Sequence, residues 1–419
     1  MPKLRFPEFR NAGEWATEPL GSLVSINTEK VGDKTCVPMS ITSGVGLVSQ
    51  EDKFGRVIAG DSYKNYLLLK PFDFAYNKSA TKEFPEGFLT LYTGDKLAAV
   101  PNSIFTCFRI TGASAHPQYL NYLFSGNLHG QWLRKFIQVG ARAHGSLSIN
   151  DSDLLALPVP VPVGQSSLVE QQKIADCLSS LDELIAAQAR KVDSLKTHKK
   201  GLMQQLFPRE GETQPRLRFP EFRDAGEWVI CELGRVSDVR DGTHDSPVFF
   251  TSGRPLVTSK NLRSDGALDL ENVSLISEED FEQINKRSKV SVGDILFGMI
   301  GTIGNPVLIK SEGFAIKNVA LIKQLGPLLN SFLVQLLQSD YVAEIFAVLN
   351  TGNSQKFIAL GKIRCLPVPV PSLQEQNGIA DCLTSLDTLI TAATKELETL
   401  KKRKKGLMQQ LFPSTVEAV

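Results

Sequence analysis

Cysteine and histidine, which often carry catalysis or hold metal ions, are few in this 419-residue sequence, and their spacing forms no familiar site. The six cysteines are scattered: Cys36, Cys107, Cys177, Cys231, Cys365 and Cys382. The five histidines are equally dispersed: His116, His129, His144, His198 and His244. They show no Cys-x-x-Cys pair, no metal-ligand spacing and no local Ser/His/Asp motif. We therefore predict no metal site, no disulfide framework and no catalytic residues in this chain, and we expect reduced thiols.

Motifs that bind phosphates or cofactors are also missing from the sequence. No Gly-x-x-x-x-Gly-Lys-Ser/Thr loop occurs. The glycines of Gly298-Met-Ile-Gly301-Thr-Ile-Gly304 have the wrong spacing for a dinucleotide-binding turn and are typical of a turn after a strand. Two lysine-rich runs, 196–200 and 401–405, have two interpretations: contact with phosphates, or charges at a solvated helix end that the helix dipole favours. We predict that this chain binds no cofactor.

The composition is typical of a soluble chain with several folded domains. Apolar residues make up 42% and charged residues 22%, so the chain can bury cores, and its length suits two or three domains. Lys and Arg (46) nearly balance Asp and Glu (45), so binding to nucleic acid would need local patches or a partner. The N-terminus lacks the apolar core of a signal peptide, and no apolar stretch is long enough to cross a membrane. We expect a cytoplasmic protein without a membrane segment.

Two segments of the sequence occur twice. Pro2–Trp15 returns as Pro215–Trp228 with two differences. Ile174–Pro208 returns as Ile379–Pro413 with 23 of 35 positions identical. Because such self-similarity decides how a chain is organised, we interpret the protein as two copies of one plan.

The segments between the repeats, residues 28–156 and 240–365, have similar lengths but almost no matching residues. Each contains short strand-like runs, such as Phe105–Ile110 and Val319–Ile322, punctuated by Gly and Pro. Apolar residues at helical spacing follow these runs in both inserts. We predict two small mixed α+β domains that keep one fold and differ in their surfaces.

Each insert is followed by a segment in which proline alternates with valine, Leu157–Pro162 and Leu366–Pro371. Such prolines block a helix and favour an extended strut, with a ligand for an SH3-type domain as the alternative. After each strut, apolar residues recur at the 4-3-4-3 spacing of a coiled coil. The seam residues are Ile174, Leu178, Leu181, Ile185, Val192 and Leu195 in the first copy, and Ile379, Leu383, Leu386, Ile390, Leu397 and Leu400 in the second.

The two seams can cover each other if the helices pack antiparallel about a pseudo-twofold axis. Helices of roughly 40 residues, with a rise of about 1.5 Å per residue, would then form a spacer on the order of 60 Å long. The alternative is that each helix packs on its own domain, which explains the apolar periodicity but not such uniform heptads. The predicted fold class is α+β, with two pseudo-symmetric halves that each consist of a globular mixed α/β domain followed by a long helix, the two helices pairing as an antiparallel coiled coil.

This combination resembles the specificity subunit of type I restriction-modification systems. The residues that carry the resemblance are Leu-Arg-Phe-Pro-Glu-Phe-Arg at 4–10 and 217–223, Arg240-Asp-Gly-Thr-His-Asp-Ser-Pro247, Val292-Gly-Asp-Ile-Leu-Phe297 with Gly301-Thr-Ile-Gly304, the two Pro-Val segments, and Glu170-Gln171 and Glu375-Gln376 at the helix starts. The resemblance covers nearly the whole chain. The first insert departs from it, because Lys70-Pro-Phe-Asp-Phe-Ala-Tyr76 stands in place of the Gly-Asp-Ile-Leu motif.

The resemblance implies a non-catalytic subunit that reads a bipartite, asymmetric site in double-stranded DNA. Each insert would be a target recognition domain for one half of the site, while the paired helices would set the gap and dock two methyltransferase subunits. Those subunits would bind S-adenosylmethionine, and restriction subunits that use ATP and Mg²⁺ would join them. The implied segments are 1–156 (first target recognition domain), 157–165 (Pro-rich strut), 166–208 (first spacer helix), 209–365 (second target recognition domain), 366–371 (Pro-rich strut), 372–413 (second spacer helix) and 414–419 (tail).

Base edges are read by Arg, Lys, Asn, Gln, Ser, Thr and His side chains, and polar loops flanked by glycine supply them in both inserts. The candidates are Asn77, Lys78, Thr81, Lys82, Arg142 and His144 in the first insert, and Thr243, His244, Lys260, Asn261, Arg263, Gln355 and Lys356 in the second. Two other functions stay open. A structural adaptor that binds no DNA and joins two protein partners would show the same doubling, and an enzyme could carry a site where an insert meets the helices. DNA binding by the assembled complex and activity of the isolated chain distinguish these alternatives.

Overall fold

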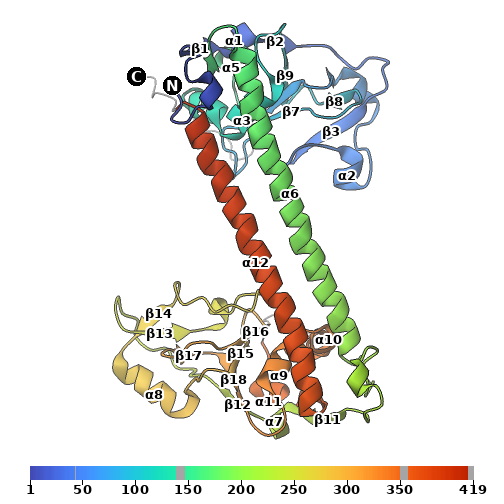
Figure 1. Ribbon diagram of the computed structural model, residues 1–419, viewed down its shortest axis with the longest axis vertical. Helices are drawn as coiled ribbons and strands as arrows, with labels where there is room; N and C mark the ends of the chain where they lie inside the picture. The colour runs from blue at the N-terminus through green and yellow to red at the C-terminus, as the bar shows by residue number, and fades with distance from the viewer. Residues whose placement is uncertain (43, 138–146, 350–356, 414–419) are drawn as a thin grey trace. The chain divides into compact units, whose positions relative to one another are not determined.

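Two compact units make up the chain, and both long helices contribute to each of them (Figure 1). The first unit consists of Met1–Gln188 and Glu396–Val419, and the second of Ala189–Lys395. The long helices are α6 (Ser167–Leu206) and α12 (Leu373–Leu411). The residues that this computed structural model describes are 1–42, 44–137, 147–349 and 357–413.

The first unit contains three small sheets. β1 pairs with β10, a four-stranded antiparallel sheet has the order β2-β9-β6-β7, and a second four-stranded sheet has the order β4-β3-β8-β5, in which β3 and β8 are parallel. The strands are β1 (Trp15–Pro19), β2 (Val24–Asn27), β3 (Val37–Thr42), β4 (Gly46–Ser49), β5 (Leu67–Leu69), β6 (Phe74–Asn77), β7 (Phe88–Leu91), β8 (Ala98–Val100), β9 (Phe105–Ile110) and β10 (Pro158–Pro162). The shorter helices are α1 (Leu20–Leu23), α2 (Gln50–Phe54), α3 (Pro117–Ser125), α4 (Leu128–Leu133), α5 (Asp151–Leu155), η1 (Pro7–Phe9), η2 (Asp61–Asn65) and η3 (Arg134–Phe136).

The second unit repeats this topology. β11 pairs with β19, the four-stranded antiparallel sheet has the order β12-β18-β15-β16, and the other sheet, β14-β13-β17, again contains one parallel pair. Its strands are β11 (Val229–Glu232), β12 (Ser237–Asp241), β13 (Arg254–Val257), β14 (Ser274–Ile276), β15 (Ile295–Gly298), β16 (Gly304–Leu308), β17 (Ala315–Ile316), β18 (Val319–Gln324) and β19 (Pro367–Val370). Its shorter helices are η4 (Pro220–Phe222), α7 (Leu233–Val236), η5 (Ser259–Asn261), α8 (Glu278–Ser288), α9 (Asn330–Leu337), α10 (Asp340–Leu349) and α11 (Leu360–Arg364). The prediction of one mixed fold in two inserts without matching residues is confirmed.

The two Pro-Val segments are β-strands and not free struts. β10 pairs antiparallel with β1, from Trp15 opposite Pro162 to Pro19 opposite Pro158, and β19 pairs with β11 in the same way. Each of these sheets has two strands, so both strands are edge strands. A proline is tolerated there at positions where the backbone nitrogen would not donate a hydrogen bond to the partner strand. Val159 and Val161 alternate with the prolines and are buried. The repeated N-terminal segment thus closes onto the end of its own insert.

The repeated helix ends complete the core of each unit. Phe412, after α12, packs its ring on Tyr119 of α3 in the first unit, with ring centroids 5.5 Å apart. Phe207, after α6, packs on Phe332 of α9 in the second unit at 5.6 Å. Trp228 lies against the same Phe332 ring at 6.1 Å. The repeated Gln-Gln-Leu-Phe-Pro sequence is therefore the anchor by which each helix end joins a globular domain.

Within each unit the seam faces of α6 and α12 meet, and the seam residues expected from the heptads are buried or partly buried. In the first unit Asp182 contacts Lys404 at 2.7 Å and Gln188 contacts Glu396 at 2.9 Å. Residue numbers therefore rise along one helix as they fall along the other, and the predicted antiparallel pairing is confirmed. In the second unit the equivalent ion pair joins Lys199 to Asp387, with N–O distances of 2.7 and 2.8 Å.

These two lysines occupy seam positions, so a charge lies inside an apolar stripe. Each carboxylate also accepts a hydrogen bond from the globular domain of its own unit: Asp182 from the Tyr122 hydroxyl at 2.8 Å, and Asp387 from the Gln335 amide at 2.9 Å. A polar pair at a seam position is favourable in only one register, because any shift would bury an unpaired charge. The two ion pairs therefore fix how the helices are aligned within each unit.

The first insert lacks the Gly-Asp-Ile-Leu motif of the second, but it forms the same turn with Phe72 in the place of Gly293. In the second unit Gly293 has φ +88°, and the buried Asp294 accepts the backbone N–H of Ser291 at 2.8 Å. In the first unit Phe72 takes φ +68°, and the buried Asp73 accepts the N–H of Lys70, also at 2.8 Å. The same turn thus forms with a phenylalanine in the left-handed conformation that favours glycine.

We expect Phe72→Gly to raise the free energy of unfolding of the first unit by up to about 1 kcal/mol. The left-handed conformation costs an L-residue about 1–2 kcal/mol, and glycine removes that cost. The greater flexibility of glycine in the unfolded chain offsets part of the gain. The ring is 54% exposed, so little burial is lost. Gly293→Ala is the matched control: a Cβ there meets no atom within 4 Å, so conformational strain alone should destabilise the second unit. Hydrogen exchange of each unit measures both effects. A loss of protection around Phe72→Gly would show that the ring stabilises this turn.

Candidate nucleic-acid interface

Five of the candidate base-reading residues, Lys78, Thr81, Lys82, Thr243 and His244, lie on loops at one end of the four-stranded sheet of their unit. In the second unit β12 ends at Asp241, which pairs with Ala320 near the start of β18, and Gly298 at the end of β15 pairs with Val319. The loops after β12 and β15 and the loop before β18 therefore meet at this end, which we call the loop edge. In the first unit Asn77 at the end of β6 pairs with Phe105 at the start of β9, which defines the same loop edge.

His244 is held in place on the loop edge of the second unit. Its Nε2 lies 2.9 Å from a carboxylate oxygen of the buried Asp241, and its Nδ1 lies 2.9 Å from the side-chain oxygen of Asn318. The hydrogen bond to Asp241 raises the pKa of His244, and the contact with Asn318 raises it further. A raised pKa keeps the ring protonated to a higher pH, so its positive charge is lost only as the pH rises through that pKa. The preceding Thr243 is partly exposed.

Lys317 adds a fixed cation next to His244. Its ammonium group donates to the backbone oxygens of His244, at 3.1 Å, and Asp245, and to the Ser246 hydroxyl at 3.3 Å. These three acceptors are neutral, so they orient the charge without cancelling it. Lys317 was not among the candidates, because its partners are 71 to 73 positions away in sequence.

Lys260, Asn261 and Arg263 follow β13 of the other sheet, and their loop reaches the loop edge, where the Ser259 hydroxyl donates to the Asn318 carbonyl at 3.2 Å. These three candidates do not share one role. Lys260 and Arg263 are exposed, and Arg263 forms an ion pair with Asp265 at 2.8 Å. Asn261 is buried: its oxygen accepts from Thr258 N–H at 2.9 Å, and its amide nitrogen donates to the Asn272 carbonyl at 2.9 Å. Asn261 therefore holds the loop that presents Lys260, and it does not offer its own amide to a ligand.

The candidates of the first unit follow β6. Asn77 is buried and accepts the N–H of Ser79 at 2.9 Å, so it shapes the turn in the way that Asn261 shapes its loop. Lys78 is partly exposed, and Thr81 and Lys82 are exposed. The Thr81 hydroxyl accepts the N–H of Phe84 at 3.0 Å.

The remaining four candidates, Arg142, His144, Gln355 and Lys356, lie outside the described residues. These four candidates belong to residues 138–146 and 350–356, and the residues that follow each of these two ranges lie at the loop edge. Leu147 N–H donates to the Lys78 carbonyl at 2.7 Å, and Ile358 N–H donates to the Met299 carbonyl at 2.9 Å. Lys78 and Met299 are therefore equivalent positions, directly after β6 and β15.

Two buried ion pairs of the repeated frame are further residues that the sequence interpretation did not single out as pairs. Arg5 binds both oxygens of Glu170 at 2.7 Å, and Arg218 binds both oxygens of Glu375 at 2.8 and 2.6 Å. Each arginine also donates to a backbone carbonyl of its own segment. The recurrence of Arg and Glu at the same places of both copies was the available signal.

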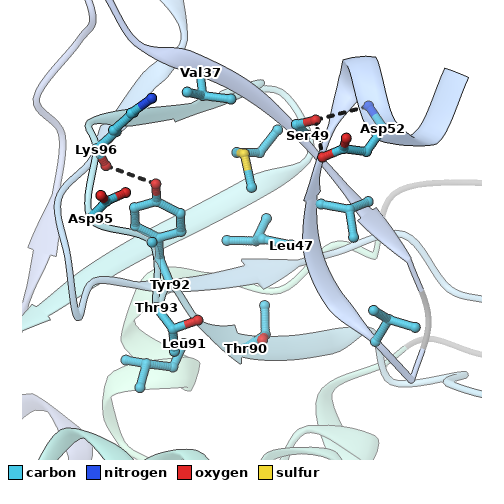
Figure 2. A pocket seen from close by; sticks show the side chains of 14 residues that line it. Val37, Leu47, Ser49, Asp52, Thr90, Leu91, Tyr92, Thr93, Asp95 and Lys96 are labelled. Atoms are coloured by element: carbon cyan, nitrogen blue, oxygen red, sulfur yellow. Dashed lines mark hydrogen bonds between the residues drawn. The ribbon is translucent and has the colours of Figure 1, made fainter. Parts of the chain in front are cut away.

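A different hollow in the first unit shows why shape alone does not define the interface. Figure 2 shows side chains that line this cavity, among them Leu47, Ser49 and Tyr92. Its volume is about 450 Å³. Its charged lining residues are Asp52, Asp95 and Lys96, so carboxylates outnumber the lysine and disfavour a phosphate. Its residues 92–96 follow Leu91, the end of β7 that pairs with Phe74 and that lies opposite the loop edge. We assign no nucleic-acid contact to it.

Across residues 1–42, 44–137, 147–349 and 357–413, no three His, Cys, Asp or Glu side chains lie close enough to hold a metal ion. Over the same part of the chain, no helix has the length and apolar character needed to span a membrane.

Comparison with known proteins gives one consistent family. Residues 227–402 match the model of the type I restriction modification DNA specificity domain. The chain is 27% identical over 276 residues to the type I restriction enzyme MjaVIII specificity subunit of Methanocaldococcus jannaschii, which covers 62% of both chains. It is 27% identical over 305 residues to the putative MjaX specificity subunit of the same organism, covering 72% of this chain and 68% of that one. The match thus spans less than two thirds of the first relative.

Solved structures show the same fold at low sequence identity. The type I restriction-modification S subunit from M. genitalium aligns over 99% of this chain and 100% of its own, with a TM-score of 0.61 and 16% identity. A chain from a structure describing complex assembly and conformational transition of a type I R-M system aligns over 96% of this chain and 98% of its own, with a TM-score of 0.56 and 15% identity. The predicted pairing of two mixed domains with long helices is therefore a known architecture.

Proposed function

We propose that this chain is a specificity subunit of a type I restriction-modification system and that it reads a bipartite, asymmetric sequence in double-stranded DNA. The observation that carries the proposal is the pair of loop edges. They share one topology, yet their residues differ: Lys78, Thr81 and Lys82 in the first unit, and His244 and Lys260 in the second. Two readers with one fold and different side chains suit two different half-sites. The relatives do not favour a structural adaptor without DNA binding.

The partners we propose are two methyltransferase subunits that use S-adenosylmethionine, joined by restriction subunits that use ATP and Mg²⁺. The repeated frame supports this proposal, because residues that are identical in both copies offer the same surface twice to a partner present twice. This chain itself would be non-catalytic and would bind none of these cofactors. In this proposal the long helices act as the spacer between half-sites, and segments 1–156 and 209–365 are the two recognition domains.

The charge balance fits a reader that shares phosphate contacts with its partners. The net charge of the chain is +1, so the chain as a whole has little general attraction for DNA. Local cations such as Lys260 and Lys317 would orient the backbone, while bases specify the site. The test is to express the chain with its methyltransferase partner in a host and sequence the methylated adenines. Two constant half-sites separated by a fixed gap support the proposal, and methylation without a common sequence contradicts it.

Lys260→Ala should weaken binding of the assembled complex to DNA about threefold to tenfold, because one phosphate contact is lost. The slope of the logarithm of the binding constant against the logarithm of the salt concentration should become shallower by about one. Lys310→Ala is the matched control. Lys310 is also exposed, but it follows the end of β16 that pairs with the start of β15, away from the loop edge. Fluorescence anisotropy over a salt series measures both variants. Equal losses in the two variants would show that general charge, and not the loop edge, attracts the DNA.

A further inference from the structure

An apolar patch lies at the loop edge of the second unit. It consists of Phe249 and Ile300, which line one cavity, and of Phe357, which forms a backbone bridge with Ile300; all three are exposed. Phe249 is 56% exposed and Ile300 is 39% exposed. Apolar side chains that gather on a surface beside a cavity mark places where a ligand binds.

Phe249 and Ile300 are two apolar walls of a cavity of about 450 Å³. The other lining residues are Leu256, Thr258, Ser259, Lys260, Asn261, Asn272, Ser274, Lys317 and Asn318. The cavity therefore combines an apolar wall, polar side chains and two lysines. Such a mixture suits an anionic ligand that carries an apolar group.

The position of the patch distinguishes a DNA ligand from a protein partner. A methyltransferase subunit bound twice would need the same surface in both units. Among the described residues, the first unit differs at one of these positions: Lys78 and Met299 are equivalent, so Ser79 stands where the second unit has Ile300. The turn after β6, Lys78-Ser-Ala-Thr-Lys82, is polar. The patch is therefore one of the features in which the two units differ. In the proposed function, the two units also differ in the base sequence that each of them reads.

We propose that Phe249 and Ile300 read a thymine in the half-site of the second unit by contacting its 5-methyl group. This inference rests on the proposed function and adds the kind of base that one loop edge selects. Thymine is the base that presents a methyl group in the major groove, where apolar side chains distinguish it. Lys260 and Lys317 bind the neighbouring phosphates, so the apolar walls approach the base edge. A uracil in that position keeps every hydrogen-bonding group and loses the methyl group.

The experiment uses the full chain assembled with its methyltransferase subunits and duplexes that carry the recognition site found by methylation sequencing. Each thymine of the second half-site is replaced by uracil, one at a time, and binding is measured by fluorescence anisotropy. We expect one replacement to weaken binding about fourfold, as for one buried methyl group. Phe249→Ala and Ile300→Ser should bind the thymine and uracil duplexes equally. Phe54→Ala, which changes an exposed phenylalanine of the first unit, should keep the fourfold difference.

The outcomes separate this inference from the proposed function. A duplex with a scrambled second half-site must bind more weakly than the natural site; if it does not, sequence reading by this chain is itself refuted. If the scrambled site is rejected but no uracil replacement weakens binding, methyl recognition is overturned and the reading stands. Retention of the thymine preference by Phe249→Ala also overturns it. So does loss of methyltransferase from purified Phe249→Ala complexes, because the patch would then bind protein.

Discussion

Replacing Arg218 by Met should destabilise the second unit by about 3–5 kcal/mol, because it leaves a buried carboxylate without its partner. The side chains of Arg218 and Glu375 are 7% and 2% exposed, and two short hydrogen bonds join them. Arg218 also donates to the Ala225 carbonyl at 2.7 Å, so the same side chain ties the repeated N-terminal segment to the start of α12. Hydrogen exchange of the second unit and the midpoint of thermal unfolding measure the loss.

Two further variants show whether the buried charge causes this effect. Arg218→Met with Glu375→Leu should recover most of the stability, since no unpaired charge stays inside. Arg235→Met should cost less than about 1 kcal/mol, because its pair with Glu232 is exposed on both sides. If Arg218→Met costs no more than Arg235→Met, the frame does not depend on this ion pair. The pair Arg5–Glu170 provides the same test for the first unit.

Exchange of residues 28–156 for the corresponding insert of another specificity subunit should change one half of the methylated site completely and leave the other half unchanged. The insert begins after β2 and ends before β10, so the repeated frame and both long helices are kept. The junction separates β2 from its partner β9, but backbone hydrogen bonds between strands do not depend on side-chain identity. The loop edge of the second unit is not altered by this exchange.

Sequencing of methylated DNA from a host that expresses the chimera gives the result directly. The reciprocal exchange, of residues 240–365, is the matched control and should change the opposite half. New sequences in both halves after one exchange would show that the units do not read independently. An unchanged site would place recognition outside the inserts.

Local patterns in the sequence were enough to predict the frame. The duplicated segments gave two copies of one plan, and the 4-3-4-3 spacing gave the seam, because a helix repeats its faces along the chain whatever surrounds it. The same reasoning predicted mixed domains in the inserts, since strand and turn signals are also local. It did not predict β-strands in the Pro-Val segments, because their pairing with β1 and β11 joins residues far apart in sequence.

The tertiary structure decided which side chains act together. His244 meets Asn318, 74 positions away, and Lys404 meets Asp182, 222 positions away, and no local pattern encodes such distances. Tertiary packing also separates neighbouring polar candidates: Asn261 is buried and hydrogen-bonded through both atoms of its amide group, while Lys260 is exposed. Polarity places a residue on a loop, but the pairing of strands and the packing beneath the loop determine whether that residue faces a ligand or supports the backbone.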